Sequence, residues 1–411
     1  MNQQGVLRAV EAAVEAAPNG SEVSLDDPSI GEIAIPLAMM LGWDPRQEIK
    51  YDAAPNSRGI ELTGGIRGLA RWLIEQGRRS SPEMALERLL KVVRENAVDE
   101  YEVVTLWGFT LSASTQVFED IHLVPLEAVP DSTQKLRVVQ GFGHPLNGPQ
   151  SALYRHFRFG PILDPALPNV GAPLMESISQ EEKTQTMRKI AAVLPALIDG
   201  PVVPVINWFE SDETASPFAG AKGAGRDFRQ FGLPVPAIVV DGARVADHVA
   251  AYLKLPNTVV DSLRIPLARL NSAKSEALEE ETLPDAFIDL GIALEALLSM
   301  EKDPTTEIGY RLAMRAAILR GGDAAFRLGT CTVLKSAYDS RSAVAHRGKL
   351  TKKKITGRVG PADPDAFFAE AAALTQELLG IVIKLGDIPD FDGLLLDGAA
   401  TSPAAEDSSP T

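Results

Sequence analysis

The chain has 411 residues, of which 45% are apolar and 23% charged, a balance typical of a globular protein with two or three domains. Its 40 basic and 55 acidic residues give a net charge of −15, which argues against nonspecific coating of nucleic acid by the whole surface. The single cysteine, Cys331, excludes an internal disulfide and a cysteine-based zinc site.

The first 98 residues are predicted to form a mostly helical region, with helices at 4–17, 59–77 and 82–97. Ser81 followed by Pro82 is a typical start for the third helix, because serine caps the first turn and proline suits its first position. The opening segment lacks the cationic and apolar parts of a signal peptide. No apolar run approaches the roughly 20 residues that span a bilayer. We therefore expect a cytoplasmic protein that does not enter a membrane.

The pattern changes in residues 99–242, which we predict to be a β-rich mixed region with long loops. Alternating or β-branched segments favour strands at 101–111, 117–126, 136–142, 202–209 and 236–242. A helix is expected near 179–198. Loops of this length are often functional.

From residue 243 to residue 387 the periodicity predicts an all-α bundle. Its expected helices are 243–254, 258–279, 285–301, 305–320, 324–347 and 363–386. Residues 388–411 are small, polar and proline-containing, and are predicted to be a disordered tail. The predicted fold class is therefore α+β, with a helical and β-rich N-terminal part followed by a C-terminal helical bundle.

Arg341 occupies an unexpected position in this bundle. It shares a helix face with Leu334, Ala337 and Val344, where an apolar side chain is the usual choice. A half-buried arginine needs a partner, and we expect that partner to be Glu295, at the edge of the apolar stripe of the helix at 285–301. Such a pair is compatible both with a purely structural role and with a place in a functional site.

His346 follows Arg341 by five residues, which corresponds to about 140° around an ideal helix, so the two side chains do not share a face. Gly348 is a natural helix stop, which places His346 in the last turn. The two side chains can meet only if the helix end is distorted or if two chains pair across a two-fold axis. An R-x4-H string alone is weak evidence for a site.

A basic segment follows the histidine. Residues 347–358 contain six basic side chains and no acidic one, namely Arg347, Lys349, Lys352, Lys353, Lys354 and Arg358. Most charge runs of this kind are solvated loops. In an otherwise acidic chain and beside a histidine, contact with the phosphates of RNA is a serious alternative.

Three segments of the helical part follow one another in the chain: FIDLGIALEALLS at 287–299, EIGYRLAMRAAIL at 307–319 and YDSRSAVAHRG at 338–348. Together they resemble the HEPN superfamily (higher eukaryotes and prokaryotes nucleotide-binding), in its Apea-like branch. The first resembles the family's ALE-x-L helix, the second its E-x-x-Y-R/K-L-A-x-R helix, and the third its Y-D-x-R-S-x-x-x-H-G signature. Arg347 is a departure, because the family usually has glycine directly after the histidine.

The resemblance implies a helical bundle that dimerises and cuts RNA without a metal or other cofactor, with the motifs of two chains meeting at the interface. By this resemblance Arg341 and His346 would be catalytic, with Glu295, Arg315, Tyr338 and Ser342 in support. It also suggests a role in phage defence, triggered by a phage-derived or other protein partner on the N-terminal region. Other members of the family are non-catalytic binding or dimerisation modules, and this alternative stays open here. A third possibility is that the β-rich region binds a ligand and the bundle only dimerises.

Two further segments carry weaker signals. The glycine-rich stretch at 220–232 lacks the GK[ST] ending of a P-loop and is expected to be a surface loop. YRHFRF at 154–159 interleaves aromatic and basic residues, which is compatible with base stacking, but strand alternation explains it at least as well.

Overall fold

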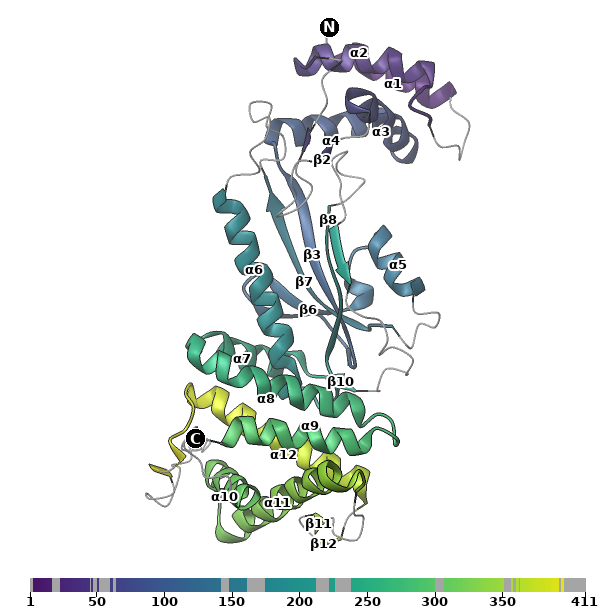
Figure 1. The fold of residues 1–411 in the computed structure, drawn as a ribbon. Coiled ribbons are helices and arrows are strands. Elements are labelled where there is room, and N and C mark those ends of the chain that lie inside the picture. Colours follow the sequence, from purple (N-terminus) through teal and green to yellow (C-terminus); the bar gives the residue numbers. More distant parts are fainter. Residues whose placement is uncertain are drawn as a thin grey trace, which may run out of the picture.

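The computed structural model describes residues 3–16, 23–44, 46, 50–51, 60–61, 64–141, 148–160, 174–211, 222–225, 238–299, 307–350, 356–357, 360–361, 363–391 and 393–394. The molecule is elongated. A group of N-terminal helices lies at one end, a twisted sheet lies in the middle, and a helical bundle lies at the other end (Figure 1). The predicted α+β architecture with a helical C-terminal region is therefore confirmed at this coarse level.

The N-terminal helices are α1 (Gln3–Ala16), α2 (Pro28–Leu41), α3 (Gly65–Arg79) and α4 (Pro82–Glu95), with a short hairpin of β1 (Lys50–Tyr51) and β2 (Ile60–Glu61). Ser81 caps α4 as expected, accepting a hydrogen bond from the Met84 amide at 3.3 Å. Helix α2, which contains Pro36, was not among the predicted helices. Asp27 caps it by accepting from the Ser29 amide at 2.9 Å, and its inner face is buried among the neighbouring helices.

The central sheet has six antiparallel strands in the order β5-β6-β7-β3-β8-β9. They are β3 (Val98–Trp107), β5 (Thr115–Phe118), β6 (Ile121–Pro125), β7 (Ser151–Phe159), β8 (Val203–Ser211) and β9 (Lys222–Gly225). A separate parallel pair joins β4 (Thr110–Leu111) to β10 (Val239–Val240). The glycine-rich stretch at 220–232 lies outside the described residues except for the four residues of β9.

Helices cover both faces of this sheet (Figure 1). Helix α6 (Leu174–Val193) packs on one face, and α5 (Thr133–Gly141) on the other. The strand predicted at 136–142 is therefore wrong. The Ser132 hydroxyl accepts from the Lys135 amide at 3.1 Å and starts a helix, which buries Val138 against the sheet. One buried valine on a short helix produces the same local pattern as a strand.

The C-terminal bundle consists of α7 (Gly242–Leu253), α8 (Asn257–Glu276), α9 (Leu283–Leu298), α10 (Ile308–Arg320), α11 (Ala324–Arg347) and α12 (Pro364–Leu385), with a small β11 (Thr356–Gly357) and β12 (Gly360–Pro361) pair. Its core continues into the sheet without a break, since Val104, Leu123 and Leu153 belong to the same buried cluster as Leu290 and Leu378. Residue 242 thus marks a change of secondary structure but not the edge of a separate core.

The chain after residue 387 does not begin as a free tail. Phe391 is 1% exposed and belongs to the bundle core, and Ile388 and Leu394 pack against that core. The predicted disordered segment therefore starts too early, because the isolated apolar residues of this stretch cover the end of the bundle. Residues 395–411 lie outside the described part of the chain.

Helix α12 is the most apolar long helix of the bundle. By length and hydropathy it is the one helix in the described ranges that could cross a membrane. Most of it is buried inside the protein, where Phe367 and Phe368 contact Phe287 of α9. Packing at the centre of the bundle therefore accounts for its apolar composition.

Candidate functional site

The site is built where α11 crosses α9 and α10, and two glycines allow this close approach. A Cβ added to Gly291 of α9 would lie 2.4 Å from Cγ of Arg341, so the arginine stem fills the space that any other residue would occupy. A Cβ added to Gly309 of α10 would lie 2.6 Å from Cδ1 of Tyr338. Both glycines belong to the segments that carry the family resemblance, and they position the two α11 side chains.

Glu295 of α9 joins these two side chains. The Tyr338 hydroxyl donates to Oε1 of Glu295 at 2.8 Å, and Nη2 of Arg341 donates to Oε2 at 3.3 Å. The guanidinium carbon of Arg341 also lies 5.6 Å from the centre of the Tyr338 ring. The predicted partnership of Arg341 with Glu295 is confirmed as an ion pair, with side chains that remain 26% and 28% exposed.

Glu295, Tyr338 and Arg341 form the Glu295 cluster, whose side chains are half-buried. Burial affects the pKa of Tyr338 and the hydrogen bonds of Arg341. Burial raises the pKa of the Tyr338 hydroxyl, and the hydrogen bond to Glu295 raises it further, so tyrosine stays a donor at neutral pH. Nε of Arg341 is buried and has no hydrogen-bond partner among the described residues. The guanidinium therefore has donor capacity beyond its bond to Glu295.

Arg315 lies deeper in the bundle than the other residues predicted to support the site. It is 4% exposed, and its Nη1 donates to the carbonyl of Leu298 at 2.9 Å, at the end of α9. Its guanidinium carbon lies 5.4 Å from the centre of the Phe391 ring. Arg315 of α10 thus contacts both the end of α9 and Phe391 near the C-terminus, so its role in this structure is to stabilise the bundle.

His346 is exposed in the last turn of α11. The helix ends at its cap residue Gly348, which adopts a left-handed conformation (φ 66°) and donates its amide to the Val344 carbonyl at 2.8 Å. The helix therefore includes both His346 and Arg347 before the cap, which accommodates the residue that departs from the family pattern. No hydrogen bond joins Arg341 to His346, in agreement with their positions on different faces.

The remaining predicted residues are only partly described. Ser342 is half-buried on α11, one turn before His346, and Arg347 and Lys349 are exposed beside the helix end. Lys352, Lys353, Lys354 and Arg358 lie outside the described residues. Within the described ranges, no three His, Cys, Asp or Glu side chains lie close enough together to share a metal ion.

A buried polar network within the sheet was not predicted from the sequence. Nε of Arg155 donates to Oε2 of Glu102 at 2.7 Å, and both side chains are almost fully buried. Thr184 of α6 and Asn207 of β8 also donate to this carboxylate, each at 3.2 Å. The available signal was the pair of acidic residues Glu100 and Glu102, which share one face of β3 with the apolar residues Val98, Val104 and Leu106.

No family model, curated protein or solved structure matches this chain. A functional assignment therefore depends on the residues of α9, α10 and α11 and on the sequence motif that they carry.

Proposed function

We propose that the C-terminal bundle is a metal-independent endoribonuclease of the HEPN type that acts in phage defence. The observation that best supports this is the Glu295 cluster, which fixes Arg341 at the surface of the bundle on the helix that ends in the exposed His346. RNA cleavage through the 2′-hydroxyl needs a cation and side chains that transfer protons near neutral pH, and arginine and histidine are residue types that can fill these roles.

In this reaction the substrate supplies its own nucleophile. A base removes the proton of the 2′-hydroxyl, the oxygen attacks the adjacent phosphorus, and an acid protonates the departing 5′-oxygen. Histidine can perform either proton transfer, and arginine can stabilise the additional charge on the phosphorane. Arg347 and Lys349 beside the helix end would hold flanking phosphates without reading the sequence.

Two copies of the chain would supply the base and the acid. His346 is the one histidine of α11, and in this proposal the second histidine comes from another chain. We therefore propose a dimer in which two α11 ends border one cleft, with RNA as the substrate and with the N-terminal regions responding to a phage-derived or other protein trigger.

The direct test is cleavage of a labelled RNA by the purified protein in the presence of EDTA. We expect a 2′,3′-cyclic phosphate product, and no cutting where the nucleotide before the scissile bond is 2′-deoxy. His346→Ala and Arg341→Ala should each lower the rate by roughly 100-fold or more. Cleavage by His346→Ala at the wild-type rate would exclude the proposal.

A matched control uses another histidine. His248 lies on α7, and its ring nitrogen contacts the Arg244 carbonyl at 2.8 Å within the same helix. His248→Ala should cut RNA at the wild-type rate. A rate loss equal to that of His346→Ala would indicate general damage rather than loss of a catalytic group.

One observation favours a second candidate function. Glu295 already compensates the charge of Arg341, which is what a structural ion pair in a binding or dimerisation module requires. Expression in a bacterial host separates the two functions. A nuclease is toxic under at least some conditions, and Arg341→Ala or His346→Ala relieves the toxicity, whereas a binding module is tolerated with or without these substitutions.

A further inference from the structure

A buried amine lies at the boundary between the sheet and the bundle. Lys274 of α8 is 5% exposed, and its Nζ donates to the carbonyls of Pro195 and Ile198 at 2.8 and 2.6 Å, and to Oε1 of Gln376 at 2.6 Å. The first two acceptors belong to the connection between α6 and β8, and the third belongs to α12. One side chain therefore joins the sheet region to two helices of the bundle.

The position of these carbonyls explains why a charged residue is placed there. Helix α6 passes into a short 3-10 helix (Leu194–Ala196), so the Pro195 carbonyl lies just beyond the C-terminal, negative end of a long helix, and the Ile198 carbonyl follows two residues after the 3-10 helix. An ammonium group has three donors, and here it has three acceptors. Burial lowers the pKa of Lys274 to about 7, and the negative charge of Asp199 acts in the opposite direction.

A second α8 side chain holds the start of β8. Oδ1 of Asn271 accepts from the Val202 amide, and its Nδ2 donates to the Val202 carbonyl, both at 2.7 Å. Asn271 and Lys274 are three residues apart and thus share one face of α8. Together they fix both ends of the 194–202 connection.

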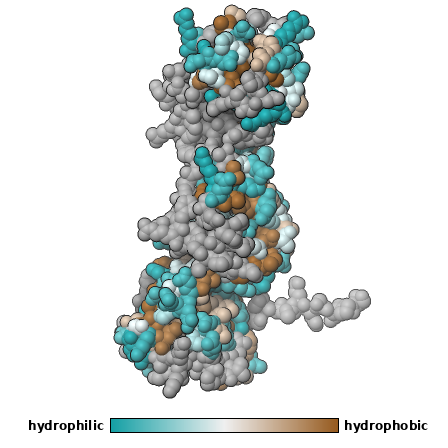
Figure 2. Space-filling view, turned by 90° about the vertical axis from the view of Figure 1, so that its right-hand side faces the viewer, coloured by the Kyte–Doolittle hydropathy of each residue, from teal (hydrophilic) through white to brown (hydrophobic). Residues whose placement is uncertain are grey.

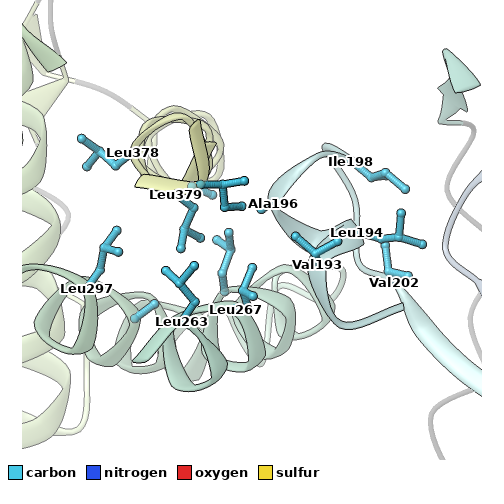
Figure 3. Close-up of a cluster of buried hydrophobic side chains, with 14 of the residues drawn as sticks. Val193, Leu194, Ala196, Ile198, Val202, Leu263, Leu267, Leu297, Leu378 and Leu379 are labelled. Atoms are coloured by element: carbon cyan, nitrogen blue, oxygen red, sulfur yellow. The ribbon is translucent and has the colours of Figure 1, made fainter. Parts of the chain in front are cut away.

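Apolar contacts surround these polar bonds. Leu194, Ala196, Ile198 and Val202 of the connection belong to the same buried cluster as residues of α8 and α12. Figure 3 shows Ala196 beside Leu379 of α12, with Leu263 and Leu267 of α8 directed toward Leu379. The connection therefore cannot move away from α8 without exposing apolar surface and leaving a buried charge unpaired.

We propose that the 194–202 connection, with Asn271 and Lys274, is a rigid joint that couples the sheet to the bundle, so that a displacement of α6 is passed to α8. Helix α8 is in turn tied to α9, because Nη1 of Arg269 donates to Oδ1 of Asp289 at 2.9 Å. Through the proposed joint, a ligand bound over the sheet would displace α9, the helix that carries Glu295. The proposal of a joint does not depend on the proposed nuclease activity.

Two probes in the chain report on the two sides of the joint. The tryptophans of the sheet, Trp107 and Trp208, give a fluorescence signal once Trp43 and Trp72 are replaced by phenylalanine. Cys331, the single cysteine, is half-buried on α11 with its sulfur 4.0 Å from that of Met314, so an increase in its rate of reaction with a thiol reagent reports opening of the bundle.

Unfolding of the full chain in urea is followed with both probes. In the protein that carries only Trp43→Phe and Trp72→Phe, the fluorescence signal and the cysteine signal should have the same urea midpoint. When Lys274→Met is added, the two midpoints should separate, and the sheet signal should change at the lower urea concentration. Lys254→Met, which removes an exposed lysine at the end of α7, should keep one midpoint.

Two results would overturn the joint. One is separate midpoints without any change at Lys274, and the other is a single shared midpoint in Lys274→Met. If Lys274→Met does not fold, Asn271→Ala removes only the contact to Val202, and coincident signals in that variant would overturn the proposal equally.

Discussion

The Tyr338 hydroxyl donates a hydrogen bond to Oε1 of Glu295 at 2.8 Å, although the two residues are 43 positions apart in the chain. The same carboxylate holds Arg341 through its other oxygen. Tyrosine thus fixes the orientation of the glutamate that orients the arginine. The R-x4-H motif is local in the sequence of α11, but the position of its arginine depends on Glu295 of α9.

Replacing Tyr338 by phenylalanine tests this hydrogen bond. Tyr338→Phe keeps the ring against Gly309 but removes the donor to Glu295, so we expect the free energy of unfolding to fall by about 1 kcal/mol. Urea unfolding of the wild type and the variant measures this difference in free energy. Tyr310→Phe is the control, because Tyr310 is 53% exposed and should change stability very little. Equal effects of the two substitutions would contradict the assigned role of the hydroxyl.

The two crossing glycines give a second prediction. Gly291→Ala places a methyl group 2.4 Å from Cγ and 2.8 Å from Cβ of Arg341, so α9 and α11 must separate, at a cost of about 1–3 kcal/mol in unfolding free energy. The control is Gly380→Ala on α12, where nothing lies within 4 Å, and where the better helix propensity of alanine should raise stability by about 0.5–1 kcal/mol. Destabilisation by both changes would show that the close approach is not the cause.

The helices of the bundle could be predicted from the sequence because each carries a clear apolar stripe and clear ends. The Arg341–Glu295 pair could be predicted for a related reason, since a charge on an apolar face requires a partner and few acids are available. The close contact of Gly291 with Arg341 could not, because a glycine inside a helix gives no sign of which side chain occupies the space beside it.

The errors have equally specific causes. Residues 136–142 contain too few apolar positions to distinguish a period of 2 from one of 3.6, and only the Ser132 cap decides for a helix. Helix α2 was not predicted, and it contains Pro36, but burial of its inner face outweighs the hydrogen bond that proline removes. The 194–202 joint is invisible in the sequence, because it depends on carbonyl groups that every residue carries.

Buried Glu100 leads to a prediction about pH. Both of its carboxylate oxygens lack a hydrogen-bond partner among the described residues, and burial raises its pKa from 4.5 to about 9, against the opposing effect of Arg155. The folded protein therefore holds this proton more tightly than the unfolded chain. Its contribution is fully favourable below pH 4.5 and is lost progressively as the pH rises toward 9.

The test compares urea unfolding of the wild type and of Glu100→Gln at pH 5, 7 and 8.5. The variant should gain stability relative to the wild type as the pH rises, by roughly 3 kcal/mol at pH 7, because glutamine is never charged. Glu87→Gln, at an exposed position of α4, should leave the pH profile unchanged. A wild-type profile parallel to that of Glu100→Gln would contradict the burial of an isolated carboxyl group.

The last prediction concerns the chain end, where Phe391 meets Arg315. Phe391→Ala should lower the free energy of unfolding by about 3 kcal/mol, because it opens a cavity in the bundle and removes the ring that lies 5.4 Å from a buried guanidinium. Leu394→Ala, at a half-buried position nearby, should cost clearly less. Thermal unfolding of the two variants decides between a docked segment and a free tail, since in a free tail neither substitution would change the melting temperature.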